Sequence, residues 1–304
     1  MPSDFEIVRP GPLAFPVTPF HEDGSLDEEG FERHLSWMLE YDPPALFVAC
    51  GTGEFASLDE AEVACLVRVT SRLVGATIPI FAGVGLGLPI ACRIARAAQE
   101  AGAHGLLVLP PYLVTAEQDG LIDYYRQLAE ATPLALILYQ RDNAVFEPAT
   151  VARLADLPTV VGFKDGLGDI ERMQRIVSAL GERLVYFNGM PTAETFQPAY
   201  SALGVHRYSS AVFNFVPEVA WAFHSALVKG DGGTVARLLS EFFVPLSNLR
   251  RQVKGYAVSL VKAGVAIRRG PVGPVRAPLV NVRSEHLKEL EGIIDRGLAA
   301  VGVG

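Results

Sequence analysis

The sequence predicts an α/β protein that forms a (β/α)8 TIM barrel with a C-terminal helical extension. A short apolar run followed by an amphipathic helical stretch occurs eight times, with starts about 20 to 35 residues apart, the length of one βα unit. Eight alternating units favour a closed barrel over an open, doubly wound sheet. The pattern ends near Gly230, and only helical patterns come after it. We therefore expect a barrel domain over residues 1–230 and an extension over residues 231–304.

The expected strands are rich in Val, Ile, Leu and Phe, as strands buried on both faces of a parallel sheet are. In chain order they are Leu13–Val17, Ala45–Ala49, Ile78–Gly83, Gly105–Leu109, Leu134–Tyr139, Val160–Lys164, Leu184–Asn188 and Val205–Ser209. Active sites of such barrels lie at the carboxyl ends of the strands. The polar residues at or just after the ends of these runs are therefore the candidates for function.

Several of the expected helices carry start or stop signals. Three segments fit the capping-box pattern, namely Ser25–Glu28, Ser57–Glu60 and Thr115–Gln118. Another helix ends at Gly102, and its apolar face consists of Ile90, Ile94, Ala97, Ala98 and Ala101. The helices expected in the extension are Gly232–Val253, Tyr256–Ala266 and Ser284–Val301, with a Pro- and Gly-rich loop at Arg269–Pro278.

The composition excludes several classes of protein. The chain has 304 residues, half of them hydrophobic, and a net charge of −8 from 34 acidic and 26 basic residues. An acidic chain does not fit a non-specific nucleic-acid binder. No apolar run reaches the roughly 18 residues that a membrane span needs, so no membrane contact is expected. The first residues, Met1–Glu6, do not resemble a secretory signal.

Cysteine, histidine and glycine patterns argue against a metal or nucleotide cofactor. The three cysteines, Cys50, Cys65 and Cys92, include no C-x-x-C pair, which predicts a reducing cytoplasm without disulfides or a zinc site. None of the six histidines has H-E-x-x-H spacing, so no metal is expected. The glycines of Gly83–Gly87 do not fit G-x-G-x-x-G, and the next strand has no acidic residue at its end, so we reject a nicotinamide site.

Lys164 is the first candidate for chemistry. It is the only one of the five lysines that lies inside a strand pattern. A lysine that points into an apolar barrel loses solvation, which favours its neutral amine. A neutral amine can attack a carbonyl group and form a Schiff base. The alternative is a structural lysine that emerges at the strand end and pairs with Asp165.

Two further strand ends carry candidates. Tyr139 ends the strand before that of Lys164, which makes it a candidate proton carrier, although a strand tyrosine can equally be a core residue. Gly51 and Thr52 form a turn whose N–H and hydroxyl groups suit a carboxylate. The alternative for this segment is a simple turn in which Glu54 caps the next helical segment.

The last expected strand leads into a polar cluster. It begins with Ser209 and Ser210, and Asn214 lies four residues further along the chain. Two hydroxyls and an amide at the mouth of a barrel suit a polyhydroxylated substrate. The alternative is that these groups cap the next helix.

Together, these motifs resemble the dihydrodipicolinate synthase / N-acetylneuraminate lyase family, over nearly the whole chain. The segments that carry the resemblance are Pro16–Phe20, Gly51–Glu54, Tyr139 and Gly162–Asp165. The resemblance implies a barrel with a C-terminal helical extension, in which Lys164 forms a Schiff base and Tyr139 moves protons. It also implies an enzyme without a cofactor, assembled as a homo-oligomer that is a dimer of dimers.

Within the family, the sequence is most similar to the 5-dehydro-4-deoxyglucarate dehydratases. The segments that carry this similarity are Leu109–Leu113, Tyr139–Asn143, Phe187–Gly189 and Tyr208–Pro217. It implies a decarboxylating dehydration of a sugar diacid in glucarate and galactarate catabolism. The substrate-binding residues expected on this basis are Gly51, Thr52, Ser209, Ser210 and Asn214. A dicarboxylate also suggests a second cation, for which Arg141 is the candidate.

Two alternative functions stay open on the sequence alone. One is a pyruvate-dependent aldolase or lyase of the same family that acts on another 2-keto acid. The synthase branch has a second tyrosine at the position of Leu113, and this substitution argues against the synthase reaction. The other alternative is a non-catalytic protein that binds keto acids on this barrel. The presence of both Lys164 and Tyr139 argues against such a binder.

Overall fold

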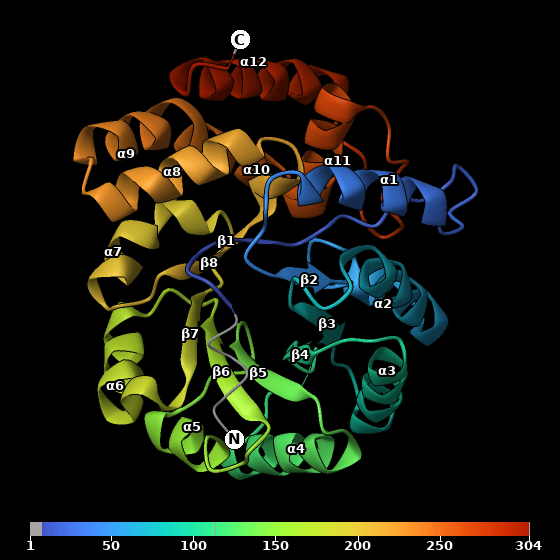
Figure 1. Cartoon of the computed structure of the whole chain (residues 1–304), viewed down its shortest axis with the longest axis vertical. Coiled ribbons are helices and arrows are strands. Elements are labelled where there is room, and N and C mark those ends of the chain that lie inside the picture. Colours follow the sequence, from blue (N-terminus) through green and yellow to red (C-terminus); the bar gives the residue numbers. More distant parts are fainter. Residues whose placement is uncertain (1–7, 113, 304) are drawn as a thin grey trace.

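The computed structural model describes residues 8–112 and 114–303. In this part of the chain, eight parallel strands form a closed barrel in sequence order, with helices around it (Figure 1). The strands are Gly11–Ala14 (β1), Leu46–Val48 (β2), Ile80–Val84 (β3), Gly105–Val108 (β4), Ala135–Gln140 (β5), Val160–Asp165 (β6), Val185–Asn188 (β7) and Arg207–Ser210 (β8). Each overlaps a predicted run, and the predicted fold class is confirmed.

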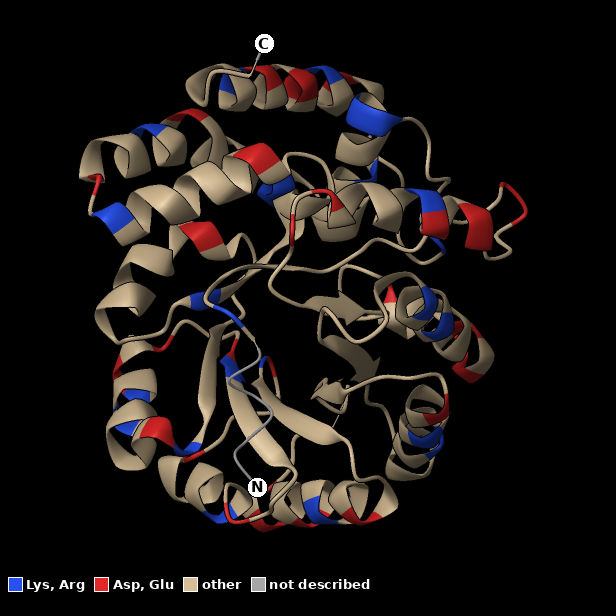
Figure 2. Cartoon of the chain, in the orientation of Figure 1, with Lys and Arg blue, Asp and Glu red and all other residues tan. Residues whose placement is uncertain are grey.

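The helices around the barrel are Glu28–Leu39 (α1), Glu60–Val74 (α2), Leu88–Glu100 (α3), Gln118–Ala131 (α4), Pro148–Leu154 (α5), Ile170–Leu180 (α6), Gln197–Ala202 (α7) and Pro217–Lys229 (α8). Short 3-10 turns lie at Phe55–Ser57, Gly181–Arg183, Ala193–Thr195 and Ala211–Asn214. Charged residues gather on the outer helices, whereas the strands carry few (Figure 2). Among the described residues, no helix is both long enough and apolar enough to cross a membrane.

The extension consists of helices that pack beside α8 and α1 (Figure 1). They are Gly232–Leu238 (α9), Val244–Gln252 (α10), Tyr256–Arg269 (α11) and Ser284–Ala300 (α12). The single helix predicted over Gly232–Val253 is wrong in one respect, because a π-helical turn at Leu239–Phe243 separates α9 from α10. The other two predicted helices are confirmed. The domain boundary at residue 230 stays a prediction.

The predicted helix starts are wrong by two residues. Helix α1 is capped by Asp27, whose carboxylate accepts from the Gly30 N–H at 2.7 Å. In α2 the capping box is formed by Asp59 and Glu62, with N–H to carboxylate distances of 2.8 and 3.1 Å. Helix α4 is preceded by Glu117, which makes no capping bond. In α1 and α2 a carboxylate two residues after the predicted serine is the stronger, charge-assisted acceptor.

A buried aromatic stack fills part of the barrel and leads to its carboxyl end. The rings of Phe15 and Phe47 are 4.6 Å apart between centroids, and those of Phe47 and Phe81 are 4.8 Å apart. Both pairs are stacked nearly parallel, so the three rings exclude water from this side of the barrel. Phe15 therefore supplies an apolar surface at the top of the strands.

Helix α11 and the loop after it are locked onto the first two βα units. Lys262 and Glu54 form a buried ion pair, with 2.7 Å between Nζ and Oε1. Arg276 donates to the carboxylate of Glu62 at 2.7 Å. The ring of Phe20 lies between both cations, 4.3 Å from Lys262 Nζ and 4.0 Å from the Arg276 guanidinium carbon. These contacts connect the extension to the loop that carries Glu54.

Candidate active site

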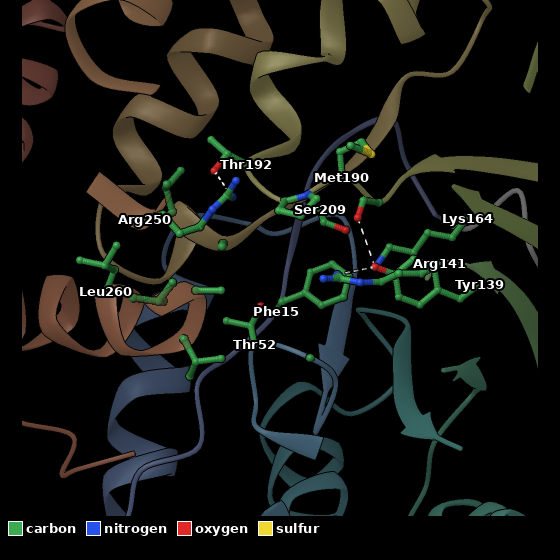
Figure 3. A pocket seen from close by; sticks show the side chains of 18 of the residues that line it. Phe15, Thr52, Tyr139, Arg141, Lys164, Met190, Thr192, Ser209, Arg250 and Leu260 are labelled. Carbon is green, nitrogen blue, oxygen red and sulfur yellow. Dashed lines mark hydrogen bonds between the residues drawn. The ribbon is translucent and has the colours of Figure 1, made fainter. Parts of the chain in front are cut away.

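A cavity of about 320 Å³ opens at the carboxyl ends of the strands, where barrel enzymes carry their active sites. Strand ends supply one part of its wall, and helices α10 and α11 of the extension supply another (Figure 3). The wall includes the candidate residues and their neighbours, namely Phe15, Gly51, Thr52, Tyr139, Arg141, Lys164, Gly189, Thr192, Glu194, Ser209 and Arg250. A cavity of this volume suits a small-molecule ligand.

The amine of Lys164 is buried in this cavity between two aromatic rings. The residue is 4% exposed, and Nζ lies 4.3 Å from the ring centroids of both Phe15 and Tyr139. Burial lowers the pKa of Lys164 to about 7, Cys50 opposes this shift, and the positive charge of Arg141 adds to it. A large fraction of the amine is therefore neutral near pH 7, the form that attacks a carbonyl carbon.

Asp165 does not pair with Lys164, although it is the next residue. Its carboxylate accepts from the Gln140 amide at 3.0 Å, from the Leu167 N–H at 3.0 Å and from the hydroxyl of Tyr200. These bonds satisfy a carboxylate that has no exposure to solvent. The alternative of a structural Lys164–Asp165 ion pair is therefore wrong. Asp165 instead fixes the end of β6 against β5.

Tyr139 lies next to Lys164, and its hydroxyl is held by polar groups. The hydroxyl donates to the Gly189 carbonyl and accepts from Arg141 Nη1, both at 3.2 Å. Burial raises the pKa of Tyr139, while the neighbouring Arg141 opposes this shift, so the phenol keeps its proton at neutral pH. A buried phenol in contact with an amine and a guanidinium can pass a proton over a short distance. Leu113, at the position where the synthase branch has its second tyrosine, lies outside the described residues.

Gly189, directly after β7, makes room for the lysine. A Cβ atom added to Gly189 would lie 2.7 Å from Lys164 Cε and 2.8 Å from its Cγ. Both distances are far below van der Waals contact, so any other residue here would displace the lysine side chain. The Gly189 carbonyl also accepts from Tyr139. One residue thus positions both members of the candidate catalytic pair.

The loop after β2 brings Gly51 and Thr52 to the cavity, as the sequence predicted. A Cβ atom added to Gly51 would meet no atom within 4 Å, so the loop leaves space for a ligand. The Thr18 hydroxyl supports the loop from below by donating to the Gly53 carbonyl at 2.7 Å. Glu54 stands at the N-cap position of the next 3-10 turn, as the alternative expects, but its side chain makes no capping bond.

Of the polar cluster formed by Ser209 and Ser210 at the end of β8 and by Asn214 after it, only Ser209 reaches the cavity wall. Its hydroxyl has no partner among the described residues. Ser210 is fully buried and donates to Glu194 at 2.7 Å. Asn214 is also fully buried, and its amide accepts from the Val17 N–H and donates to the Phe15 carbonyl, both at 2.9 Å. Direct substrate contact by Ser210 and Asn214, predicted from the sequence, is not supported, because neither lines the cavity.

Three polar residues of the wall were not predicted from the sequence. Arg250, on α10, donates to the hydroxyl of Thr192 at 2.6 Å. Glu194 is fully buried, and burial raises its pKa to about 7. Thr192 and Glu194 come shortly after β7, so their place after a strand end was a usable signal. Arg250 has no such signal, because it lies on a helix outside the repeating pattern. The described residues contain no cluster of three metal-ligating side chains.

Comparisons with known proteins agree with this geometry. The dihydrodipicolinate synthetase family matches over residues 10–296. The chain is 52% identical to the probable 5-dehydro-4-deoxyglucarate dehydratase 1 of Streptomyces coelicolor, over 98% of this chain and 96% of the relative. It is 47% identical to the corresponding probable dehydratase of Rhodococcus jostii, over 94% of both chains.

Among solved structures, the dihydrodipicolinate synthase of Bacillus clausii superimposes with a TM-score of 0.86 at 24% identity, covering 94% of this chain and 96% of that one. At this level of identity the superposition shows the fold alone. The family match, by contrast, spans nearly the whole chain and includes every strand of the barrel. On that evidence, the chain belongs to the dihydrodipicolinate synthetase family.

Proposed function

We propose that this protein is a cytoplasmic lyase that converts 5-dehydro-4-deoxyglucarate to 2,5-dioxopentanoate, CO2 and water through a Schiff base on Lys164. The observation that carries the proposal is the buried amine of Lys164, whose pKa is lowered to about 7. The high identity to dehydratases of that description supports the choice of substrate. The proposed role of the reaction is in the catabolism of sugar diacids.

The first step forms the covalent intermediate. The neutral Lys164 amine attacks the C5 ketone, and the resulting carbinolamine loses water to give an iminium ion. This water needs a proton, and we assign its delivery to the hydroxyl of Tyr139, whose ring packs against Lys164 Nζ. Arg141 donates to the same hydroxyl, which stabilises the phenolate whenever the proton has left.

Dehydration and decarboxylation follow from the electron demand of the iminium. The iminium acidifies C4, and removal of a C4 proton gives an enamine that expels the C3 hydroxyl as water. The product is a conjugated iminium, which accepts the electron pair of the C1–C2 bond when C1 leaves as CO2. Protonation at C4 restores the iminium, and protonation at C3 converts the C2 enol to an aldehyde. Hydrolysis of the iminium then releases 2,5-dioxopentanoate. One lysine thereby supports both eliminations.

In this proposal, groups of the substrate are assigned to residues of the cavity wall. Gly51 and Thr52 would bind the C6 carboxylate beside the reacting ketone, since their loop presents open space and a hydroxyl there. The unpartnered hydroxyl of Ser209 would bind a substrate hydroxyl. Arg141, which the sequence suggested for the second carboxylate, already contacts Tyr139 and the Asp142 carboxylate at 3.2 Å each.

The direct test is to incubate the purified protein with 5-dehydro-4-deoxyglucarate in the presence of a chelator. Stoichiometric CO2 and a product of the mass of 2,5-dioxopentanoate are expected. Borohydride added during turnover should trap an adduct on Lys164, and Lys164→Met should give neither product nor adduct. Release of pyruvate without CO2 would instead assign the protein to the aldolases. An adduct on another residue would remove Lys164 from the proposal.

Assembly into a homo-oligomer is part of this proposal. Two apolar side chains near the cavity mouth are exposed in the single chain, Tyr112 at 44% and Val114 at 54%. Burial of this surface between copies would remove apolar area from water. Light scattering on the purified protein should give a mass of four chains, and a single-chain mass at all concentrations would contradict the assembly.

A further inference from the structure

The cavity is lined by three cationic side chains, and one of them has no established task. Lys164 and Arg141 lie close to Tyr139, whereas Arg250 comes from helix α10 of the extension. Figure 3 shows Arg250 across the cavity from Lys164, with Ser209 between them. An elongated ligand that is attached to Lys164 and passes Ser209 would therefore extend toward Arg250.

Arg250 differs from Arg141 in its partners. Arg141 forms an ion pair with Asp142. Arg250 forms no ion pair with any carboxylate among the described residues; its guanidinium donates to Thr192 at 2.6 Å and to Ser247 at 3.5 Å. Burial lowers the pKa of Arg250, with Arg251 and Arg141 adding to the shift and Glu194 opposing it, and a guanidinium keeps its charge at neutral pH. A partly buried cation without a counter-ion is costly, and a bound anion would offset that cost.

Glu194 lines the same cavity and its charge acts on Arg250, but the two form no ion pair. Its Oε1 accepts from the Ser210 hydroxyl at 2.7 Å, and its Oε2 has no partner among the described residues. Burial of the carboxyl group also raises its pKa to about 7, which reduces its negative charge at neutral pH. The place beside Arg250 thus remains open to an anion from a ligand.

The backbone around Thr192 is built to hold Arg250 in place. Thr192 has a φ of 53°, in the left-handed region that β-branched residues rarely adopt. In this conformation its hydroxyl accepts from Arg250 Nη1. The remaining N–H groups of the guanidinium provide the two parallel donors that bind a carboxylate.

We propose that Arg250 binds the distal carboxylate of a dicarboxylic 2-oxo acid whose ketone is joined to Lys164. The inference rests on the Schiff base of the proposed function and adds the group that selects a diacid. It replaces Arg141 in that task. It also gives the extension a direct part in substrate recognition, since Lys164 and Tyr139 come from the barrel strands and Arg250 from α10.

The test compares two six-carbon probes that differ only at the far end, 2-oxoadipate and 2-oxohexanoate. Each is incubated with the protein and borohydride, and the concentration that half-saturates adduct formation on Lys164 is measured. The wild-type protein should prefer 2-oxoadipate, and Arg250→Gln should lower this preference roughly 10- to 100-fold, the range for a hydrogen-bonded charge. Trapping of 2-oxohexanoate should be unchanged.

Three further variants make the result specific. Arg251→Gln removes the same charge from an exposed neighbour that does not line the cavity, and it should keep the wild-type preference. Thr192→Val, which removes only the hydroxyl that holds Arg250, should lower the preference by a smaller factor. Arg141→Gln should lower adduct formation with both probes alike. If Arg250→Gln is poorly folded by circular dichroism, Thr192→Val still decides the matter.

Several outcomes would overturn the inference. They are equal affinity of the wild-type protein for both probes, an unchanged preference in Arg250→Gln and Thr192→Val, and failure of 2-oxoadipate to be trapped on Lys164. The proposed function fails separately. If the protein selects 2-oxoadipate through Arg250 but releases no CO2 from 5-dehydro-4-deoxyglucarate, the carboxylate site stands and the reaction does not.

Discussion

Tyr139 and Lys164 are paired across strands β5 and β6, and their side chains meet inside the cavity. Their Cα atoms are partners in the parallel register, and Lys164 Nζ lies 4.3 Å from the centroid of the Tyr139 ring. The contact is therefore set by the barrel itself rather than by a loop. Arg141 and Gly189 complete it by binding the tyrosine hydroxyl. Strands β5 and β6 therefore hold the two members of the candidate catalytic pair side by side.

Adduct formation should depend on pH through the amine of Lys164. Because burial lowers the pKa of Lys164 to about 7, the rate of borohydride trapping with pyruvate should rise about tenfold per pH unit below 7 and level off above. The rate is measured by mass spectrometry of the intact protein between pH 5 and 9. A rate that continues to rise up to pH 10 would show an amine with an ordinary pKa.

Tyr139→Phe should lower kcat by roughly 100- to 10,000-fold, the usual contribution of a positioned proton donor, with little change in KM. The ring and its contact with Lys164 remain, whereas the proton donor and its hydrogen bonds with Gly189 and Arg141 are lost. Tyr186→Phe is the matched control, since its hydroxyl donates to the Gly181 carbonyl outside the cavity. Equal activity of both variants would remove Tyr139 from the proton transfer.

Gly189→Ala should reduce adduct formation at least tenfold while the barrel stays folded. The added methyl group would come within 2.8 Å of two Lys164 side-chain carbons, so the amine must move. The control is Gly232→Ala, at a position where an added Cβ meets no atom within 4 Å. Both are assayed by trapping and by thermal unfolding. A Gly189→Ala protein with wild-type trapping would show that the lysine has more room than the contacts indicate.

Lys164 should lower stability at neutral pH, and the effect should fade as the pH rises. Its pKa is about 7 in the folded protein against an ordinary value of 10.5, so between these values the unfolded chain binds more protons and stability increases with pH. Lys164→Met should be more stable at pH 7. The difference in free energy of unfolding between Lys164→Met and the wild-type protein should decrease by about 1.4 kcal/mol per pH unit up to pH 9, as measured by urea unfolding. A constant difference would contradict this.

Lys262→Met should destabilise the protein by about 3–5 kcal/mol, because Glu54 would be left as an unpaired buried charge. The double variant with Glu54→Gln should recover part of this loss, since no charge then remains buried. Denaturant unfolding of the single and double variants measures both effects. A double variant less stable than Lys262→Met would show that the pair does more than balance charge.

The sequence predicted the features that depend on local pattern. It missed those that depend on how distant segments pack against the barrel. All eight strands arise from apolar runs, and the pairing of Tyr139 with Lys164 arises from their places at adjacent strand ends. Asn214 carries the same polar signal but folds inward, where it bonds to the backbone of residues 15 and 17. Arg250 could not be placed, because nothing local indicates that α10 reaches the cavity.

The capping boxes show a second limit of the sequence. The pattern fitted at Ser57, yet the helix starts at Asp59, whose carboxylate accepts from the Glu62 N–H. Both serine and aspartate satisfy the same rule, and the charged carboxylate of Asp59 is the stronger acceptor of the two. Patterns of this kind locate a helix but leave its first turn undecided.

The contacts that join the extension to the loop of Glu54 also set an order of events during synthesis. The Arg276 N–H donates to the Glu54 carboxylate at 3.0 Å, a contact between positions 222 residues apart. Glu54 ends the loop that carries Gly51 and Thr52, so that loop cannot acquire its final support until nearly the whole chain has left the ribosome. The strands can begin to pair earlier, because a growing chain folds from its N-terminus. The strands that carry Tyr139 and Lys164 can therefore pair before the loop of Gly51 and Thr52 gains this contact.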